Sequence, residues 1–280
     1  MRLESYRGPE GFEALKSEWN ALLHASSADT VFSTWEWQTA WWEHLAAGDL
    51  WLTAGRDEGS GELAAIFPCY VRQEPSGDRV VRLVGCIEVA DYLDLIVRKG
   101  REEVAYSAFL EALSGPDAPA WDSVDLCNIA EGAPTMRLLP ELAGAAGLHA
   151  HVIEEDVCPI IDLPATWEEY LSSIDKKQRH EIRRKLRRAD ADAEMEWYVV
   201  GGDHDLHYEV DRFLELHQKS SPDKAEFMDA QMVEFFHGIA ESMQAAGWLR
   251  LMQLKFDGRH EASIMAFDYG DAILLYNSGF

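Results

Sequence analysis

The chain has 280 residues, of which 47% are hydrophobic, and this is enough to bury one large or two ordinary domain cores. It carries 50 acidic against 25 basic residues, a formal charge of −25, which argues against general nucleic-acid binding because most of the surface repels a polyanion. The sequence also lacks a signal-peptide core and any apolar run of membrane-spanning length, so we expect a cytoplasmic protein with no membrane span.

The predicted elements of the first half alternate between helices and strands. Apolar residues recur at three-and-four spacing between Phe12 and Leu23, which predicts a first helix. A second helix is predicted to begin at a capping box formed by Ser33 and Glu36. Helices are also predicted at 102–113 and 134–147, and strands at 50–55, 62–71, 79–85, 91–97, 121–129 and, as an extended run, 149–163. This alternation is typical of an α/β layer structure.

The second half begins with two helices and then repeats a similar order. Thr166 and Glu169 form a capping box after Pro164, and a basic helix follows with Ile182, Leu186 and Ala189 as its apolar side. The remaining predictions are a strand at 194–200, helices at 205–220 and 229–247, and strands at 248–256, 261–269 and 272–280.

The two halves resemble one another in the order of their elements. Trp51 opens a strand that is followed by a glycine turn and a second strand. Trp248 also opens a strand, which is followed by a turn at Asp257 and Gly258 and by a second strand. We interpret this as a duplication of one α/β unit. The fold class is therefore predicted as α/β (α+β in some schemes), with mixed sheets flanked by helices. The expected division is 1–165, a connecting helix at 166–190, and 191–280.

The four cysteines and the histidines show no pattern of metal ligands. Cys69, Cys86, Cys127 and Cys158 lie far apart in apolar surroundings, without a C-x-x-C spacing, and are predicted to be buried reduced thiols. No metal-ligand spacing, P-loop or dinucleotide fingerprint is present, so we expect no bound metal.

Several segments, in this order, resemble the FemAB-like, cellulose-biosynthesis-associated (CelD-type) family of GNAT-type acyltransferases. The likeness runs from about Val31 to the last residue and rests on TWEWQTAWWEHL, DYLDLIV, YLSSIDKKQRHEIRRKLRRA, FLELH, WLRLMQLKFDGRHEASIMAF and ILLYNSGF. The tryptophans of the first segment are interpreted as packing residues, with a sugar-stacking surface as the alternative.

The resemblance implies two tandem GNAT domains and transfer of an acyl group from an activated donor to an amine. It implies acyl-CoA (acetyl-CoA) as co-substrate, or an aminoacyl donor, and a small-molecule or cell-envelope precursor as acceptor, within polysaccharide or cell-envelope biosynthesis. The segment SSPDKAEF (220–227) departs from the family, which places an arginine, a tryptophan and a glycine there. A GNAT unit also continues beyond the strand that ends at Phe280, so we expect the second domain to be incomplete and the chain to be truncated.

The basic helix is the first candidate for substrate binding. Residues 176–188 hold eight of the 25 lysines and arginines, and Arg179 and Arg183 share a face at i, i+4 spacing. Guanidinium groups bind phosphate or carboxylate in a bidentate fork, so Lys176, Arg179, Arg183 and Arg184 are predicted to bind an anionic substrate. Two alternatives are a basic face docked on an acidic neighbouring domain and contact with nucleic acid such as tRNA, a donor in some FemAB-like relatives.

Two titratable residues are candidates for catalysis. His217 lies on the apolar stripe of its helix and is predicted to accept the proton of an attacking amine. The alternative is a core histidine that bonds a backbone carbonyl. Asp94 lies in DYLDLIV, where it or Asp91 would orient the acceptor amine; the alternatives are a turn cap and an exposed strand residue.

The last strand is the predicted binding site for the donor. By the resemblance, backbone N–H groups of Tyr276, Asn277 and Ser278 hold the thioester and pantetheine and stabilise the oxyanion. The alternative function is a catalytically silent GNAT-like module that binds an anionic ligand through the basic helix.

Overall fold

The structure is a computed structural model of residues 1–280 that describes all residues except 87–88 and 193, and the side chains of 190 and 192. The chain divides into two compact units. Unit 1 comprises Met1–Glu155 and Glu234–Ala246, and unit 2 comprises Asp156–Val233 and Gly247–Phe280. Within the described residues, no helix is both long enough and apolar enough to cross a membrane.

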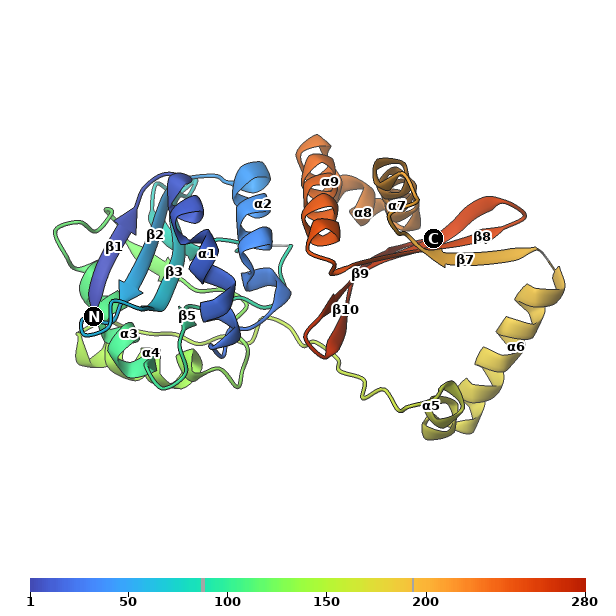
Figure 1. The fold of residues 1–280 in the computed structure, drawn as a ribbon, viewed down its shortest axis with the longest axis horizontal. Coiled ribbons are helices and arrows are strands. Elements are labelled where there is room, and N and C mark those ends of the chain that lie inside the picture. The colour runs from blue at the N-terminus through green and yellow to red at the C-terminus, as the bar shows by residue number, and fades with distance from the viewer. Residues whose placement is uncertain (87–88, 193) are drawn as a thin grey trace. The chain divides into compact units, whose positions relative to one another are not determined.

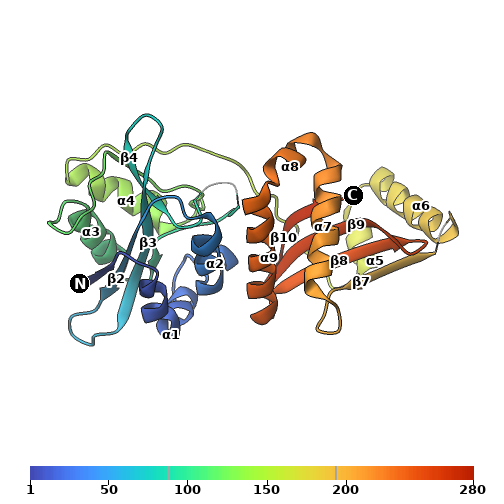
Figure 2. The same cartoon turned by 90° about the horizontal axis from the view of Figure 1, so that it is seen from above.

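Unit 1 is a mixed sheet with helices on both faces. The strands β1 to β4 and β6 are neighbours in chain order, β5 pairs with β3, and only β4 and β6 run parallel among the described pairs. Figure 2 shows α1 and α2 on one face and α3 and α4 on the other. The bounds are β1 Arg2–Tyr6, α1 Glu10–His24, α2 Trp35–Leu45, β2 Asp49–Arg56, β3 Leu63–Gln73, β4 Arg79–Leu83, β5 Ile96–Val97, α3 Glu102–Leu113, β6 Ser123–Asp125 and α4 Pro134–Ala145.

The core of unit 1 explains why these segments fold as they do. The strands β2 and β3 are buried along almost their whole length, as strands covered on both faces must be. The apolar stripe of α1 is buried, and Trp37 and Trp41 of α2 are buried too, which supports the packing interpretation of these tryptophans. The helix α2 is capped one residue later than predicted, because Thr34 rather than Ser33 accepts from the backbone N–H of Trp37.

Unit 2 contains a four-stranded sheet whose described pairs are all antiparallel, in the order β10-β9-β8-β7. The helix α7 lies across this sheet (Figures 1 and 2) and buries Val210, Phe213 and Leu214 against it. The bounds are α5 Trp167–Ser173, α6 Lys176–Asp192, β7 Met195–Val199, α7 Leu206–Ser220, α8 Pro222–Phe227, β8 Leu249–Phe256, β9 Arg259–Tyr269 and β10 Ala272–Gly279. The helix α9, Ala230–Ala245, begins in unit 2 and continues in unit 1, where Phe235 contacts Trp37 with ring centroids 6.0 Å apart.

The predicted repeat of elements is present. In each half a strand precedes two main helices and three further strands, and β1–β2–β3–β4 pair in the same antiparallel order as β7–β8–β9–β10. The α/β class with two sheets flanked by helices is therefore confirmed. The first segment of unit 1 ends at Glu155, ten residues before the expected boundary at residue 165. The expected connecting helix at 166–190 falls within unit 2.

The prediction of four buried, reduced cysteines is wrong for three of them. Cys86 and Cys127 form a disulfide with Cα atoms 6.0 Å apart, and Cys158 is exposed. The parallel pairing of β4 with β6 brings the ends of two strands together, and Cys86 and Cys127 follow these strands. Only Cys69, at 0% exposure, fits the prediction.

Candidate active site

The candidate site lies where α7 meets the end of β10. Asp205 caps the start of α7, and its side chain accepts from the backbone N–H of Tyr208. Phe213 and His217 are one turn apart, so the apolar stripe that packs α7 on the sheet carries the imidazole inward, and His217 is only 2% exposed.

His217 bonds the backbone of β10. Its Nδ1 lies 3.0 Å from the carbonyl oxygen of Ser278, and a carbonyl can only accept, so Nδ1 carries the proton and Nε2 the lone pair. Burial lowers the pKa of His217, the nearby Lys224 ammonium lowers it further, and the bond to Ser278 opposes both. The imidazole is therefore neutral near pH 7. This is the geometry expected of a core histidine that bonds a backbone carbonyl.

Lys224 reaches the same carbonyl from α8. Its Nζ donates to the oxygen of Ser278 at 2.7 Å, so a cation and an imidazole share one acceptor. The helix α8 places Lys224 there because Ser221 caps it and Pro222 occupies its first position. In the sequence this segment stood out only as a departure from the family pattern, and Lys224 was not predicted as a site residue. The Ser-Pro pair was the signal for a helix start.

The strand β10 is irregular at the residues predicted to bind the donor. Its register with β9 shifts between Leu275 and Asn277, which is a β-bulge at Tyr276. A bulge bends the strand and redirects its backbone, and bulges are frequent beside active sites. In the described sheet β10 is an edge strand, so one side of its backbone faces away from β9.

Close packing holds the end of β10 against α7. A Cβ placed on Gly279 would overlap the backbone of Leu216 and His217, so this position has room only for glycine. The site thus combines a bulge, two donors to one carbonyl and a backbone-to-backbone contact within four residues of β10.

A second polar cluster fixes the other end of α7. The carboxylate oxygens of Glu209, which is 5% exposed, accept from the hydroxyl of Tyr198 at 3.0 Å, and Gln253 donates to the carbonyl of Glu209 at 3.0 Å. His260 Nε2 lies 3.1 Å from the Tyr198 hydroxyl. These contacts join α7 to β7, β8 and β9 and so position His217 two turns further along.

Asp94 lies in unit 1, whereas His217 lies in unit 2. Asp94 is 6% exposed, and its Oδ1 accepts from Thr135 at 2.6 Å and from the N–H of Leu95 at 2.7 Å; Thr135 in turn contacts the hydroxyl of Tyr106 at 2.7 Å. Burial raises the pKa of Asp94 to about 6, and the bonds from Thr135 and Leu95 limit this rise. Its catalytic role stays a prediction. Only Ile96–Val97 of the strand predicted at 91–97 is a strand.

The predicted substrate-binding residues of α6 make local contacts. Arg179 donates to the carbonyl of Leu171 at 3.1 Å, Arg183 to Glu168 at 2.6 Å, and Arg184 to Glu181 at 2.9 and 2.7 Å. Lys176 begins the helix and is exposed. None of these partners belongs to α7 or β10, so the role of the four residues in substrate binding stays a prediction.

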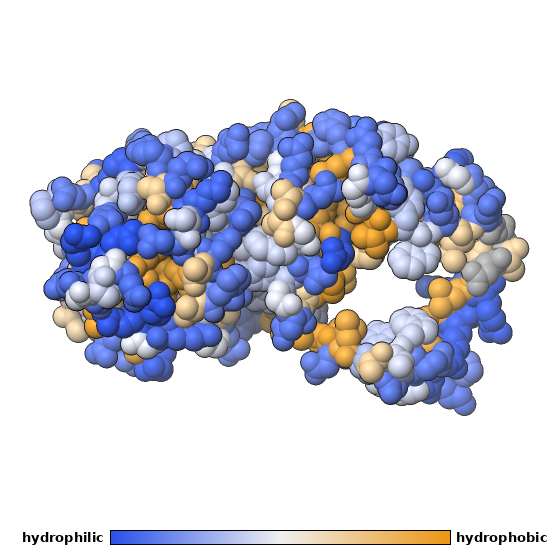
Figure 3. All heavy atoms as spheres, viewed as in Figure 1, coloured by the Kyte–Doolittle hydropathy of each residue, from blue (hydrophilic) through white to orange (hydrophobic). Residues whose placement is uncertain are grey.

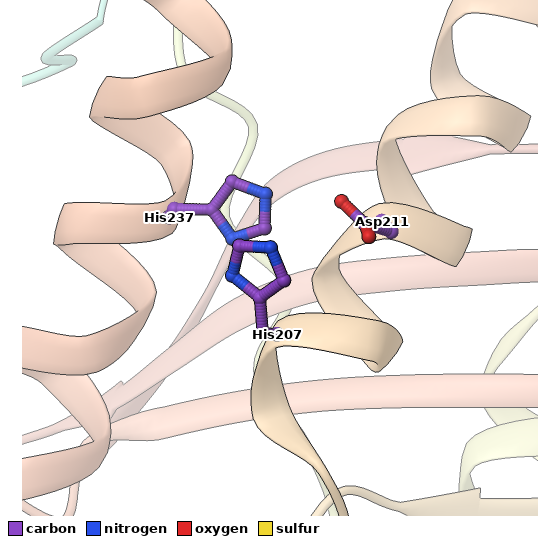
Figure 4. Close-up of side chains that lie close together, drawn as sticks. All are labelled: His207, Asp211 and His237. Carbon is purple, nitrogen blue, oxygen red and sulfur yellow. The ribbon is translucent and has the colours of Figure 1, made fainter.

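His207 and Asp211 lie one turn apart on α7, and Figure 4 draws them with His237 of α9. Imidazole and carboxylate are common metal ligands. Because His207 and Asp211 belong to unit 2 and His237 to unit 1, the three do not form a site of either unit. We assign no metal to them.

Comparison with known proteins supports the expected resemblance. Residues 176–280 match the family model of the acetyltransferase (GNAT) domain, a range that contains every residue of the α7–β10 site. Among the solved structures that resemble the chain is the crystal structure of FemX, with a TM-score of 0.57 and 14% sequence identity. The alignment covers 91% of this chain and 58% of the FemX chain. No curated protein matches the sequence. The resemblance to FemAB-like GNAT acyltransferases is thus confirmed in the fold and in the matched domain.

Proposed function

We propose that unit 2 transfers an acyl group from a thioester donor of the acyl-CoA type to an amine, with β10 as the donor-binding strand. The observation that carries this proposal is the β-bulge at Tyr276, close to the carbonyl of Ser278, to which His217 and Lys224 both donate. The match of residues 176–280 to the GNAT acetyltransferase domain supports it. An aminoacyl ester is the second class of donor that this chemistry allows.

In the proposed reaction the backbone N–H groups of residues 276–278 orient the acyl donor. The nitrogen of the amine attacks the thioester carbonyl carbon, and the oxyanion that develops accepts from these N–H groups. The carbon–nitrogen bond forms, the carbon–sulfur bond breaks, and the thiolate leaves with the proton that the amine loses. Lys224 adds a positive charge beside the strand, which favours the oxyanion.

The structure supports a positioning role for His217 in place of the predicted general base. An imidazole with 2% exposure and its Nδ1 bonded to the strand is placed to fix the end of β10. Its neutral state preserves that bond, since a neutral ring with Nδ1–H is a good donor to a carbonyl. The bond then acts on catalysis through the backbone that holds the donor.

The acceptor is proposed to be an amine of a small molecule or of a cell-envelope precursor. The acidic surface of the chain favours cationic amines over polyanions at long range. The alternative function, a silent module that binds an anionic ligand through α6, predicts no turnover with any donor.

The experiment is a thiol-release assay on the complete chain with a panel of acyl-CoA donors and amines. We expect thiol release that depends on both the donor and the amine. In parallel, thermal shift measures donor binding, because a ligand at a hundred times its Kd adds about 2.7 kcal/mol of stability. Stabilisation by a donor without thiol release from any pair would favour the silent module. Neither stabilisation nor release with acyl-CoA or aminoacyl esters would refute the proposed function.

A further inference from the structure

Residues 157–188, hereafter the arm, comprise an extended segment, α5 and α6, and they expose large apolar side chains beside many cations. Trp167 is 51% exposed and Leu186 44%. In the extended segment the exposure is still higher, at 74% for Val157, 85% for Ile160, 61% for Ile161 and 73% for Leu163. Figure 3 shows apolar side chains along this segment next to the hydrophilic surface of α5 and α6. Such a concentration of exposed apolar groups marks a binding surface.

The helix α6 is an amphipathic basic helix with a narrow apolar side. At about 100° per residue, Ile182, Leu186 and Ala189 lie within a sector of about 60°, and Arg179 and Lys185 flank it on opposite sides. None of the side chains that the structure describes in α6 is buried. Much of both sides of the helix therefore remains exposed, and its bonds to another element of unit 2 are those of Arg179 and Arg183 to Leu171 and Glu168 of α5.

The charge of the arm is opposite to that of the whole chain. The arm holds eight basic and five acidic residues, whereas the chain carries a net charge of −25. An anionic surface is therefore attracted by the arm and repelled by the rest of the molecule. This asymmetry fixes which part of the protein approaches such a surface.

We propose that the arm binds the surface of an anionic lipid bilayer. Cations that flank an apolar helix side, with aliphatic residues and a tryptophan nearby, have the pattern of an interfacial element that lies in the headgroup region. Lipid acyl chains take up Ile160, Ile161 and Leu186, while lysines and arginines meet lipid phosphates. A nucleic acid would use the cations and leave the aliphatic side chains in water, so the arm fits a bilayer better. The proposal is independent of the acyl-transfer reaction.

The test is vesicle flotation with the complete chain. We expect binding to vesicles of phosphatidylglycerol mixed with phosphatidylcholine, and none to pure phosphatidylcholine. The double variant Lys177→Glu/Lys185→Glu should weaken binding by at least twentyfold, because each cation near an anionic surface contributes a factor of about five. The variant Ile160→Ser/Ile161→Ser should weaken it by roughly tenfold or more through loss of apolar burial. Circular dichroism and the melting temperature check that each variant is folded.

The matched control is Lys99→Glu/Arg137→Glu, which makes the same change of net charge at two exposed positions of unit 1. We expect it to bind anionic vesicles within about twofold of the parent, since neither residue lies in the arm. The proposal is overturned if the parent binds no anionic vesicle, if the control loses as much as the arm variants, or if the serine variant binds like the parent. Binding of a tRNA-sized RNA in preference to vesicles, lost in Lys177→Glu/Lys185→Glu, would identify a nucleic acid as the partner instead.

Discussion

Asp94 shows how burial changes the chemistry of one carboxyl group. It was predicted from DYLDLIV as a residue that orients an amine, yet its closest partners are a threonine and a backbone N–H inside unit 1. Nothing in the spacing of the sequence indicates that Thr135, 41 residues away, donates to it. The contact arises because α4 begins beside the segment that precedes β5.

The first prediction concerns the pH dependence of stability. Burial raises the pKa of Asp94 from 3.8 to about 6, so between these values the folded protein holds a proton that the unfolded chain has released. Raising the pH through this window therefore lowers the free energy of unfolding, by about 3 kcal/mol in total. Asp94→Asn has no such proton, so its stability should fall less across the window. Urea unfolding from about pH 4 to 7 measures the difference, and parallel curves for parent and variant would refute it.

Two roles of His217 could not be distinguished from the sequence. Its place on the apolar stripe predicted both a general base and a core histidine, because each role needs an inward imidazole. The hydrogen bond to Ser278, which is 61 residues away, favours the core-histidine interpretation and is set by the packing of α7 on β10. The general-base role stays a prediction.

The second prediction compares His217→Ala with His217→Asn. The asparagine Nδ2–H can replace Nδ1–H as donor to Ser278, but an amide cannot act as a base near pH 7. We expect the alanine variant to raise the KM for the donor about tenfold, as the loss of one positioning hydrogen bond would. The asparagine variant should keep kcat and KM within about threefold of the parent. If both variants lose about a hundredfold in kcat and the acidic limb of the pH profile disappears, His217 is the general base.

At the scale of elements, the sequence predicted segments with strong local signals. The capping box of Thr166 and Glu169 is present with both of its hydrogen bonds, and Gly247 follows the last turn of α9 with a positive φ of 79°. The predicted strand at 121–129 shrinks to Ser123–Asp125, and the extended run at 149–163 pairs with no described strand. Apolar residues favour a strand locally, but a strand forms only where a neighbour completes the ladder.

Two elements were missed, each for its own reason. The strand β1 exists because Arg2–Tyr6 pairs with β2, which lies about fifty residues further along the chain. The helix α8 is only six residues long, too short for a periodic pattern to indicate it. The β-bulge of β10 also depends on its pairing with β9 and has no local signal in ILLYNSGF.

The third prediction tests the contact between α7 and β10. Gly279→Ala would bring a Cβ against the backbone of Leu216 and His217, and backbone cannot move aside as a flexible side chain can. We expect the free energy of unfolding to fall by about 1–3 kcal/mol, as in other overpacked positions. Ser278→Ala keeps the carbonyl that His217 bonds and serves as the control, with an expected change within about 0.5 kcal/mol. Urea unfolding checks both. An alanine at 279 that leaves stability unchanged would show that the two backbones are not in close contact.

At the scale of the whole molecule, the repeated order of elements could be read from the sequence. The matching positions of Trp51 and Trp248 before paired strands indicated a duplication, and the two sheets share the order of their first four strands. The disulfide between Cys86 and Cys127 and the grouping of 234–246 with unit 1 could not be read, because both depend on contacts between residues far apart in the sequence. The apolar residues of 157–163 were predicted only as part of an extended run, and their exposure could not be predicted, since the pattern alone cannot show which neighbour covers them.

The central claim is that an acyl donor binds along β10, and amide hydrogen exchange in the complete chain tests it most directly. The probe is a non-hydrolysable thioether analogue of acetyl-CoA, compared with the free protein. The claim predicts that backbone amides in residues 272–280 exchange more slowly with the analogue bound, because the N–H groups of the bulge then donate to it. Binding of the analogue with unchanged exchange in 272–280, and protection only in unit 1 or the arm, would contradict the claim.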